Sequence, residues 1–385
     1  MRLPVAAALI NDMKDLALYI HIPFCAAKCA YCDFASWPNK EGEWGQYFET
    51  LWAETEAWKP KLSGYQAATV FIGGGTPTLV PSAYIAETLA RARAAAPFAP
   101  DAEITVEGNP GTLTPDKLAD YRAAGVNRLS LGAQSFDDGL LRLLGRIHGS
   151  SQIGEAVALA RAAGFGNINL DLMYALPGQT MAQWLATLDS AASLGVEHIS
   201  AYSLIVEPGT PMASRVARGE AALPPDDAVN AMQRAAVERL AAAGYARYEI
   251  SNYARHGREC RHNLVYWRRG EYLGVGCAAH SLLDGCRFAN PPGLDEYLSG
   301  VRGIGRQRLT RQDAMEETLM LATRTVRGLD LSAWRAEFRE DFTAGRGDAL
   351  RRLNEAGYIE MSDGFLRLTT RGMELQNAVV VALLD

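Results

Sequence analysis

The stretch Cys25-Ala-Ala-Lys-Cys29-Ala-Tyr31-Cys32 decides how this sequence is interpreted, because it places three cysteines at the spacing C-x3-C-x2-C. Cysteine thiolates are the ligands that iron–sulfur clusters require. A [4Fe–4S] cube has four irons, so three thiolates leave one iron open to an external ligand. The spacing therefore predicts a [4Fe–4S] cluster on Cys25, Cys29 and Cys32, with Tyr31 beside it.

Two other interpretations of these cysteines are a zinc site and buried free thiols. Structural zinc takes four ligands, and the nearest further candidates are Asp33 and His21. A disulfide framework is disfavoured, because three of the six cysteines fall within one short stretch of a 385-residue chain. We expect Cys260, Cys277 and Cys286 to be packed thiols without a ligand role.

Composition and charge exclude several classes of protein. The net charge of −6 gives no electrostatic argument for binding nucleic acid or an anionic membrane. No stretch approaches the roughly 20 apolar residues that span a bilayer. Residues 1–10 lack a convincing cleavage site, so we expect an N-terminal arm and not a signal peptide. The expectation is a cytoplasmic protein with no nucleic-acid partner and no stable membrane insertion.

Short apolar runs alternate with amphipathic patterns over about the first 205 residues. The runs predict strands at residues 16–22, 68–72, 103–106, 128–131, 167–172 and 198–204. The patterns predict helices at residues 44–58, 82–95, 115–124, 153–163 and 181–194, several of which end in Ala-Gly or Leu-Gly. Strands that alternate with helices imply a parallel sheet with right-handed crossovers. Six units are too few for a closed eight-stranded barrel, so we predict an α/β fold with a partial (β/α)6 barrel and its chemistry at the carboxyl ends of the strands.

The chain divides into three predicted domains. Residues 1–225 form the barrel, residues 226–305 form an extension that begins with a helix at 226–243, and residues 306–385 form a C-terminal module. In that module we predict helices at residues 313–325, 331–340 and 349–356 and a hairpin of strands at 357–360 and 365–368. Helices followed by a small hairpin suggest a winged-helix-like α+β module. Its arginines are mixed with acidic residues, which favours an accessory or partner-docking role over DNA binding.

The segment Tyr19-Ile-His-Ile-Pro-Phe-Cys25, followed by the three-cysteine loop, resembles the radical S-adenosylmethionine superfamily in its oxygen-independent coproporphyrinogen III oxidase-like branch. The resemblance covers about residues 16–300, and the C-terminal module also fits that branch. It implies a radical S-adenosylmethionine (radical SAM) partial barrel with a [4Fe–4S] cluster, whose open iron is the binding point of S-adenosylmethionine. Tyr19, as part of this motif, is assigned to the cofactor site.

Further motifs follow in the family's order. The loop Gly73-Gly74-Gly75-Thr76 resembles the family's loop for the amino group of S-adenosylmethionine, and Gly74, Gly75 and Thr76 are assigned to it. Four polar residues at or near strand ends resemble the family's other cofactor contacts: Glu107, Gln134, Arg146 and Asp171. A guanidinium suits the cofactor's carboxylate, and the two carboxylates suit its amine or its ribose hydroxyls.

Two features distinguish members of the branch. Coproporphyrinogen oxidases carry a fourth cysteine at the position where this chain has Phe34. With phenylalanine at this position, the motif C-x3-C-x2-C-x-F resembles that of the related HemW family of heme chaperones. The segment His262-Asn263-Leu-Val-Tyr266-Trp267 matches the H-N-x-x-Y-W motif associated with heme in that family. The resemblance implies heme binding by His262, Asn263, Tyr266 and Trp267, with an imidazole available to iron and aromatic rings to the macrocycle. His280 and His148 are weaker heme candidates.

The resemblance implies a heme chaperone that binds heme, a [4Fe–4S] cluster and S-adenosylmethionine, and transfers heme to an acceptor protein such as a membrane respiratory enzyme. One alternative is a radical SAM oxidoreductase, in which the reduced cluster cleaves the cofactor and the resulting radical acts on a tetrapyrrole. A winged-helix regulator that uses the cluster as a sensor is a third option. The oligomeric state stays open, with a homodimer among the options.

Overall fold

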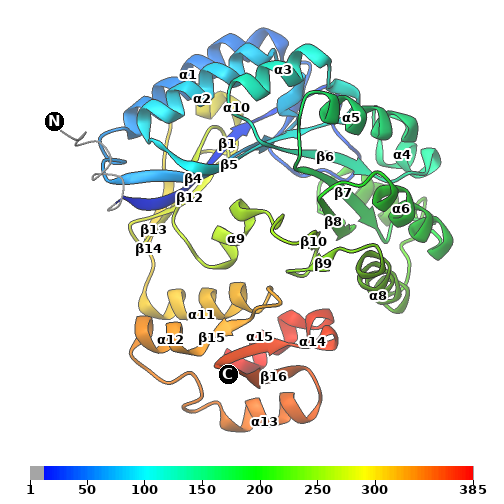
Figure 1. Cartoon of the computed structure of the whole chain (residues 1–385), viewed down its shortest axis with the longest axis vertical. Coiled ribbons are helices and arrows are strands. Elements are labelled where there is room, and N and C mark those ends of the chain that lie inside the picture. The colour runs from blue at the N-terminus through cyan, green and yellow to red at the C-terminus, as the bar shows by residue number, and fades with distance from the viewer. Residues whose placement is uncertain (1–12, 385) are drawn as a thin grey trace, which may run out of the picture.

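One sheet of 12 strands organises the molecule, in the order β14-β13-β12-β11-β1-β4-β5-β6-β7-β8-β10-β9 (Figure 1). The computed structural model describes residues 13–384, so the predicted arm at residues 1–10 lies outside the described part. Six parallel strands match the six predicted ones: β1 (Lys14–Ile22), β4 (Tyr65–Gly74), β5 (Phe98–Gly108), β6 (Arg128–Gln134), β7 (Ile168–Tyr174) and β8 (His198–Ser203). The order is linear and not circular, which confirms a partial barrel.

Helices cover the outer side of these strands (Figure 1). The predicted ones are present: α1 (Trp44–Trp58), α2 (Ser82–Ala95), α3 (Pro115–Ala123), α5 (Ser150–Ala162) and α6 (Met181–Ser193). Gly125, Gly164 and Gly195 follow three of them with positive φ, as a glycine stop requires. The short helices α4 (Asp138–Leu144) and α7 (Pro211–Ala217) are not among the predicted elements, because one or two turns give too little periodicity.

The extension adds strands to both edges of the barrel sheet. After α8 (Asp226–Ala242), strands β9 (Ala246–Arg247) and β10 (Asn252–Ala254) join β8 in antiparallel pairing. The helix α9 (Arg261–Trp267) then crosses the open, concave side (Figure 1). Strand β11 (Tyr272–Val275) pairs in parallel with β1. Three further strands follow it in successive antiparallel pairs: β12 (His280–Leu283), β13 (Cys286–Ala289) and β14 (Ile304–Arg308). The helix α10 (Leu294–Leu298) lies between β13 and β14 in the chain.

The C-terminal module has a hydrophobic core of its own, with Leu319, Trp334 and Leu366 buried in it. Its elements are α11 (Arg311–Ala322), β15 (Leu329–Asp330), α12 (Leu331–Phe338), α13 (Gly347–Glu355), β16 (Ile359–Ser362), β17 (Phe365–Leu368), α14 (Thr370–Glu374) and α15 (Gln376–Leu384). The predicted helices and hairpin are therefore present. Across residues 13–384, every helix falls short of the length and apolar character that a membrane span needs.

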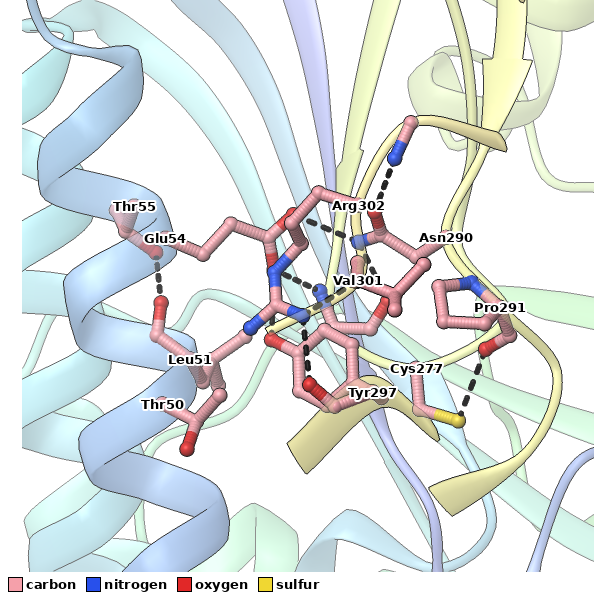
Figure 2. A network of polar contacts seen from close by, with 12 residues as sticks. Thr50, Leu51, Glu54, Thr55, Cys277, Asn290, Pro291, Tyr297, Val301 and Arg302 are labelled. Atoms are coloured by element: carbon pink, nitrogen blue, oxygen red, sulfur yellow. Dashed lines mark hydrogen bonds and ion pairs between the residues drawn. The ribbon is translucent and has the colours of Figure 1, made fainter. Parts of the chain in front are cut away.

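A buried carboxylate joins the extension to the barrel (Figure 2). Glu54 of α1 accepts hydrogen bonds from the Gly276 N–H at 3.0 Å, from Asn290 Nδ2 at 2.6 Å and from the Tyr297 hydroxyl at 2.6 Å. Arg302 adds an ion pair at 3.5 Å. Burial raises the pKa of Glu54, and the donated hydrogen bonds oppose that rise. This network holds the loop after β11 against α1.

We expect Glu54→Ala to lower the free energy of unfolding by about 3 kcal/mol, because it leaves an arginine and three buried donors without their acceptor. Urea denaturation of the purified chain measures this effect. Glu220→Ala is the matched control, since the Arg218–Glu220 pair is more than half exposed and such pairs contribute ~0–1 kcal/mol. Equal losses in the two variants would contradict a structural role for the network.

Candidate functional site

A cavity of about 370 Å³ lies at the carboxyl ends of the parallel strands. Its walls include the three-cysteine loop, the glycine-rich loop after β4 and the ends of β5, β6 and β7. Ten residues assigned to the site from the sequence line it: Cys25, Cys29, Cys32, Gly74, Gly75, Thr76, Glu107, Gln134, Arg146 and Asp171. Residues spread over nearly 150 positions therefore face one space, which is the arrangement expected of an α/β fold.

The three thiols of the loop are free and half-buried. They do not converge on one point, since no three His, Cys, Asp or Glu side chains within residues 13–384 could hold a single metal ion. A cube offers its irons at separate corners, so its thiolates need not converge. Burial raises the pKa of Cys25 and of Cys32, and the hydroxyl of Thr76 opposes the rise at Cys25 with a hydrogen bond at 3.6 Å. The donor set fits an iron–sulfur cluster.

Arg146 connects the thiol loop to the strand ends. Its Nη1 donates to Cys29 Sγ at 3.3 Å and its Nη2 to the Gly132 carbonyl at 2.6 Å. Its Nε is buried and has no hydrogen-bond partner among the described residues. A buried, unpartnered N–H is costly and calls for a further acceptor. The Arg146 guanidinium lines the cavity, and its positive charge suits a ligand with a carboxylate.

The glycines after β4 leave space that a side chain would fill. Gly74 has φ +114°, and a Cβ there would lie 2.5 Å from the His21 ring. At Gly75 a Cβ would lie 2.6 Å from the Phe24 carbonyl oxygen and 3.0 Å from Cys25 Sγ. Only glycine lets the backbone run this close to the cysteine loop. The loop therefore lies close against the cysteine loop, and the N–H groups of Gly75 and Thr76 donate to the carbonyls of Ile22 and Phe24, both at 2.8 Å.

Two half-buried carboxyl groups, Glu107 and Asp171, line the same cavity from neighbouring strands. Burial, together with the charge of Asp171, raises the pKa of Glu107 to about 8. Burial likewise raises the pKa of Asp171, although Ser130 Oγ at 3.0 Å and Asn169 Nδ2 at 2.8 Å donate to it. The Gly74 N–H donates to Glu107 Oε2 at 3.1 Å. A cation in the cavity would favour ionisation of both groups, so the site is suited to an amine.

Gln134 ends β6 in the left-handed region with φ +64°, which is uncommon outside glycine and occurs often at functional sites. Met173, Tyr202 and Ile147 also line the cavity, although they were not among the assigned residues. The sequence offered a positional signal only for Met173, which follows a predicted strand, and for Tyr202, which lies near the end of one. Apolar residues at such positions are indistinguishable in sequence from core residues.

The H-N-x-x-Y-W motif forms α9, on the concave side of the sheet. His262 is buried, with Nδ1 2.8 Å from Thr69 Oγ1 and Nε2 2.8 Å from the Tyr266 hydroxyl. Burial lowers the pKa of His262 to about 3, so its ring is neutral. Tyr266 lines a second cavity, while Trp267 lies under the guanidinium of Arg324 at 4.6 Å. Neither Trp267 nor Asn263 lines either of the two cavities.

The remaining candidates are dispersed. His148 is buried, with its ring nitrogens 3.0 Å from Asn109 Oδ1 and 3.2 Å from the Ala133 carbonyl. Cys260 and Cys277 are buried beside Glu103 and the Pro291 carbonyl, and Cys286 lies on β13. Tyr19 lines the second cavity and not the first. His280 also lines the second cavity and is exposed.

Comparisons with known proteins agree with this geometry. A family model described as the Radical SAM superfamily matches residues 19–191, and one described as the HemN C-terminal domain matches residues 309–375. A Mycobacterium tuberculosis protein named heme chaperone HemW is 38% identical over 379 residues, which cover 96% of this chain and 95% of that protein. A Bacillus subtilis protein of the same name is 35% identical over 372 residues, covering 95% and 98%.

A solved structure resembles the whole molecule. Coproporphyrinogen III oxidase HemN from Escherichia coli, described as a radical SAM enzyme, superposes with a TM-score of 0.84 at 25% identity, covering 99% of this chain and 93% of that one. Barrel, extension and C-terminal module are therefore all shared with that protein. The predicted α/β fold class is confirmed.

We expect the stability of the cluster-free chain to fall as pH rises from about 4.5 to about 8, since Glu107 keeps its proton when folded and loses it when unfolded. Glu107→Gln removes this contribution and is more stable than the wild type at pH 9, by on the order of 3–5 kcal/mol. Urea denaturation at pH 5, 7 and 9 measures the difference. The exposed Glu87→Gln serves as control, and parallel pH profiles for all three proteins would rule the effect out.

Proposed function

The chain belongs to the HemW family of the radical S-adenosylmethionine superfamily, and we propose that it is a heme chaperone. In this proposal it binds heme as cargo and passes it to an acceptor protein such as a membrane respiratory enzyme. It also binds a [4Fe–4S] cluster and S-adenosylmethionine. The names of its relatives support heme as the cargo, and the cavity at the strand ends supports the cluster and its cofactor.

The single observation that carries the cofactor assignment is the meeting of three thiols with the strand-end residues around one cavity. Cys25, Cys29 and Cys32 would hold the cluster, which supplies an electron and an open coordination position when bound. Arg146, whose guanidinium lines the cavity, would pair with the carboxylate of S-adenosylmethionine.

The two carboxyl groups in the cavity would bind the polar groups of S-adenosylmethionine that Arg146 does not. Glu107 and Asp171 would meet the amine or the ribose hydroxyls, and a bound cation would let Glu107 release the proton that burial makes it keep. Gly74 and Gly75 would bring the backbone against the ligand. A cluster held by thiolates needs a reducing compartment, so we place the protein in the cytoplasm.

A second function keeps support from the likeness to coproporphyrinogen III oxidase. With the same cavity, the chain would act as a radical SAM oxidoreductase on a tetrapyrrole. Phe34 favours the chaperone, because it is 63% exposed at the mouth of the cavity and offers no thiol there. The two functions differ in whether S-adenosylmethionine is consumed.

We expect Cys25→Ser to lose the cluster, because a hydroxyl is a poor ligand for iron in a cube. Anaerobic reconstitution followed by iron and sulfide analysis and visible absorption measures this. Cys286→Ser is the matched control, since Cys286 lies on β13 away from the cavity and its loss leaves iron content unchanged. Wild-type iron content in Cys25→Ser would refute the cluster assignment.

The chaperone and the oxidoreductase are separated by one reconstituted sample. We expect stoichiometric binding of added heme, transfer of that heme to an acceptor, and no sustained formation of 5′-deoxyadenosine with dithionite and coproporphyrinogen. Heme titration and product analysis by chromatography measure these quantities. Continued 5′-deoxyadenosine formation coupled to coproporphyrinogen consumption would establish the enzyme instead.

A further inference from the structure

A second cavity, of about 360 Å³, adjoins the first and shares Phe34, Gly74 and Glu107 with it. It lies among β1, the helix α9 and the strands β11 and β12, and its other walls are mostly aromatic or small. Tyr19, Tyr266 and Tyr272 contribute three rings to it. Cavities of this size, with apolar walls and few polar groups, are typical of sites for small organic ligands.

The aromatic walls are held in place before any ligand arrives. Tyr266 meets Tyr272 edge to face with centroids 4.8 Å apart, and Tyr19 stacks on Phe71 at 6.3 Å. The Tyr266 hydroxyl is tied to His262, whose ring stacks on Phe71 at 5.1 Å. Fixed rings reduce the ordering that binding would otherwise require. A flat, apolar ligand suits such walls.

The chain has six histidines, and the structure describes all of them. Four are buried with both ring nitrogens within hydrogen-bond distance of a partner: His21, His148, His198 and His262. An imidazole in that state must break a buried hydrogen bond before it can bind iron. None of the four is therefore ready to act as a ligand.

The other two histidines are exposed, and one of them lines one of the two cavities described above. His256 lies in the loop after β10 and lines neither cavity. His280, at the start of β12, lines the aromatic cavity, and no residue within 13–384 makes a hydrogen bond to its ring. A neutral imidazole with a free nitrogen is a common ligand of heme iron.

We infer that the aromatic cavity is the heme site and that His280 is the ligand of the heme iron. This inference rests on the proposed chaperone function and deepens it. Tyr266 lies against the macrocycle, and His262 is a positioning residue that orients Tyr266. The macrocycle projects from the mouth of the cavity beside the exposed His280, where an acceptor protein can reach it.

The test uses full-length protein with the cluster reconstituted, so that the cluster cysteines are not available to heme. Ferric heme is titrated into the wild type, His280→Ala and His256→Ala, and ligation is determined by resonance Raman and electron paramagnetic resonance spectroscopy. Replacing a residue that merely hydrogen-bonds to a metal ligand typically lowers metal affinity by about 10–100-fold. Loss of the iron ligand itself should therefore weaken heme binding by roughly tenfold or more. His256→Ala is the matched control, with an exposed imidazole outside both cavities.

The expected result is that His280→Ala alone loses the histidine signature and regains it when free imidazole is added. His262→Ala, checked for folding by circular dichroism and cluster content, keeps the signature. An unchanged spectrum and affinity in His280→Ala would overturn the inference while leaving the chaperone function in place. A wild type that binds no heme would overturn the proposed function itself. If His262→Ala does not fold, the spectra of His280→Ala with and without added imidazole still show whether His280 is the iron ligand.

Discussion

The architecture depends on β1 having hydrogen-bonded neighbours on both sides. It pairs in parallel with β4 over Lys14 to Ile22 and with β11 over Ala17 to Ile20, so its central residues are paired on both sides within the sheet. Because β1 leads directly into the cysteine loop, the two strands that pair with β1 bring the residues at their ends close to that loop. β4 brings the glycine loop, and β11, about 250 residues later, brings the aromatic cavity.

The two cavities share a wall, and this connects the proposed cofactor site to the proposed heme site. Phe34, Gly74 and Glu107 line both. Glu107 is half-buried, and a cation in the first cavity would oppose the rise of its pKa. The same side chain also lines the second cavity.

Buried polar groups hold the extension in the register that forms the second cavity. Glu54 binds the Gly276 N–H, Asn290 and Tyr297, and the Tyr47 hydroxyl donates to the His21 carbonyl at 2.7 Å while accepting from the Cys277 N–H at 3.2 Å. Each of these bonds would be costly to leave unmade in the interior. These hydrogen bonds fix the backbone of the turn between β11 and β12. They thereby help to position His280, which is the first residue of β12.

The sequence by itself determined the barrel and the cofactor cavity. Alternating apolar runs and helical patterns predicted six strands and five helices, and two of the helices match to the residue, since both kinds of element leave a local periodic signal. The family resemblance named Glu107, Gln134, Arg146 and Asp171, and three of them lie on parallel strands, which finish at one edge of a sheet. Tertiary structure alone decided the second cavity. The pairing of β1 with β11 joins residues too far apart for any local pattern to record. Hydrogen bonding inside the core occupied both nitrogens of His262 and left those of His280 free, and that outcome depends on which groups meet after the chain has folded.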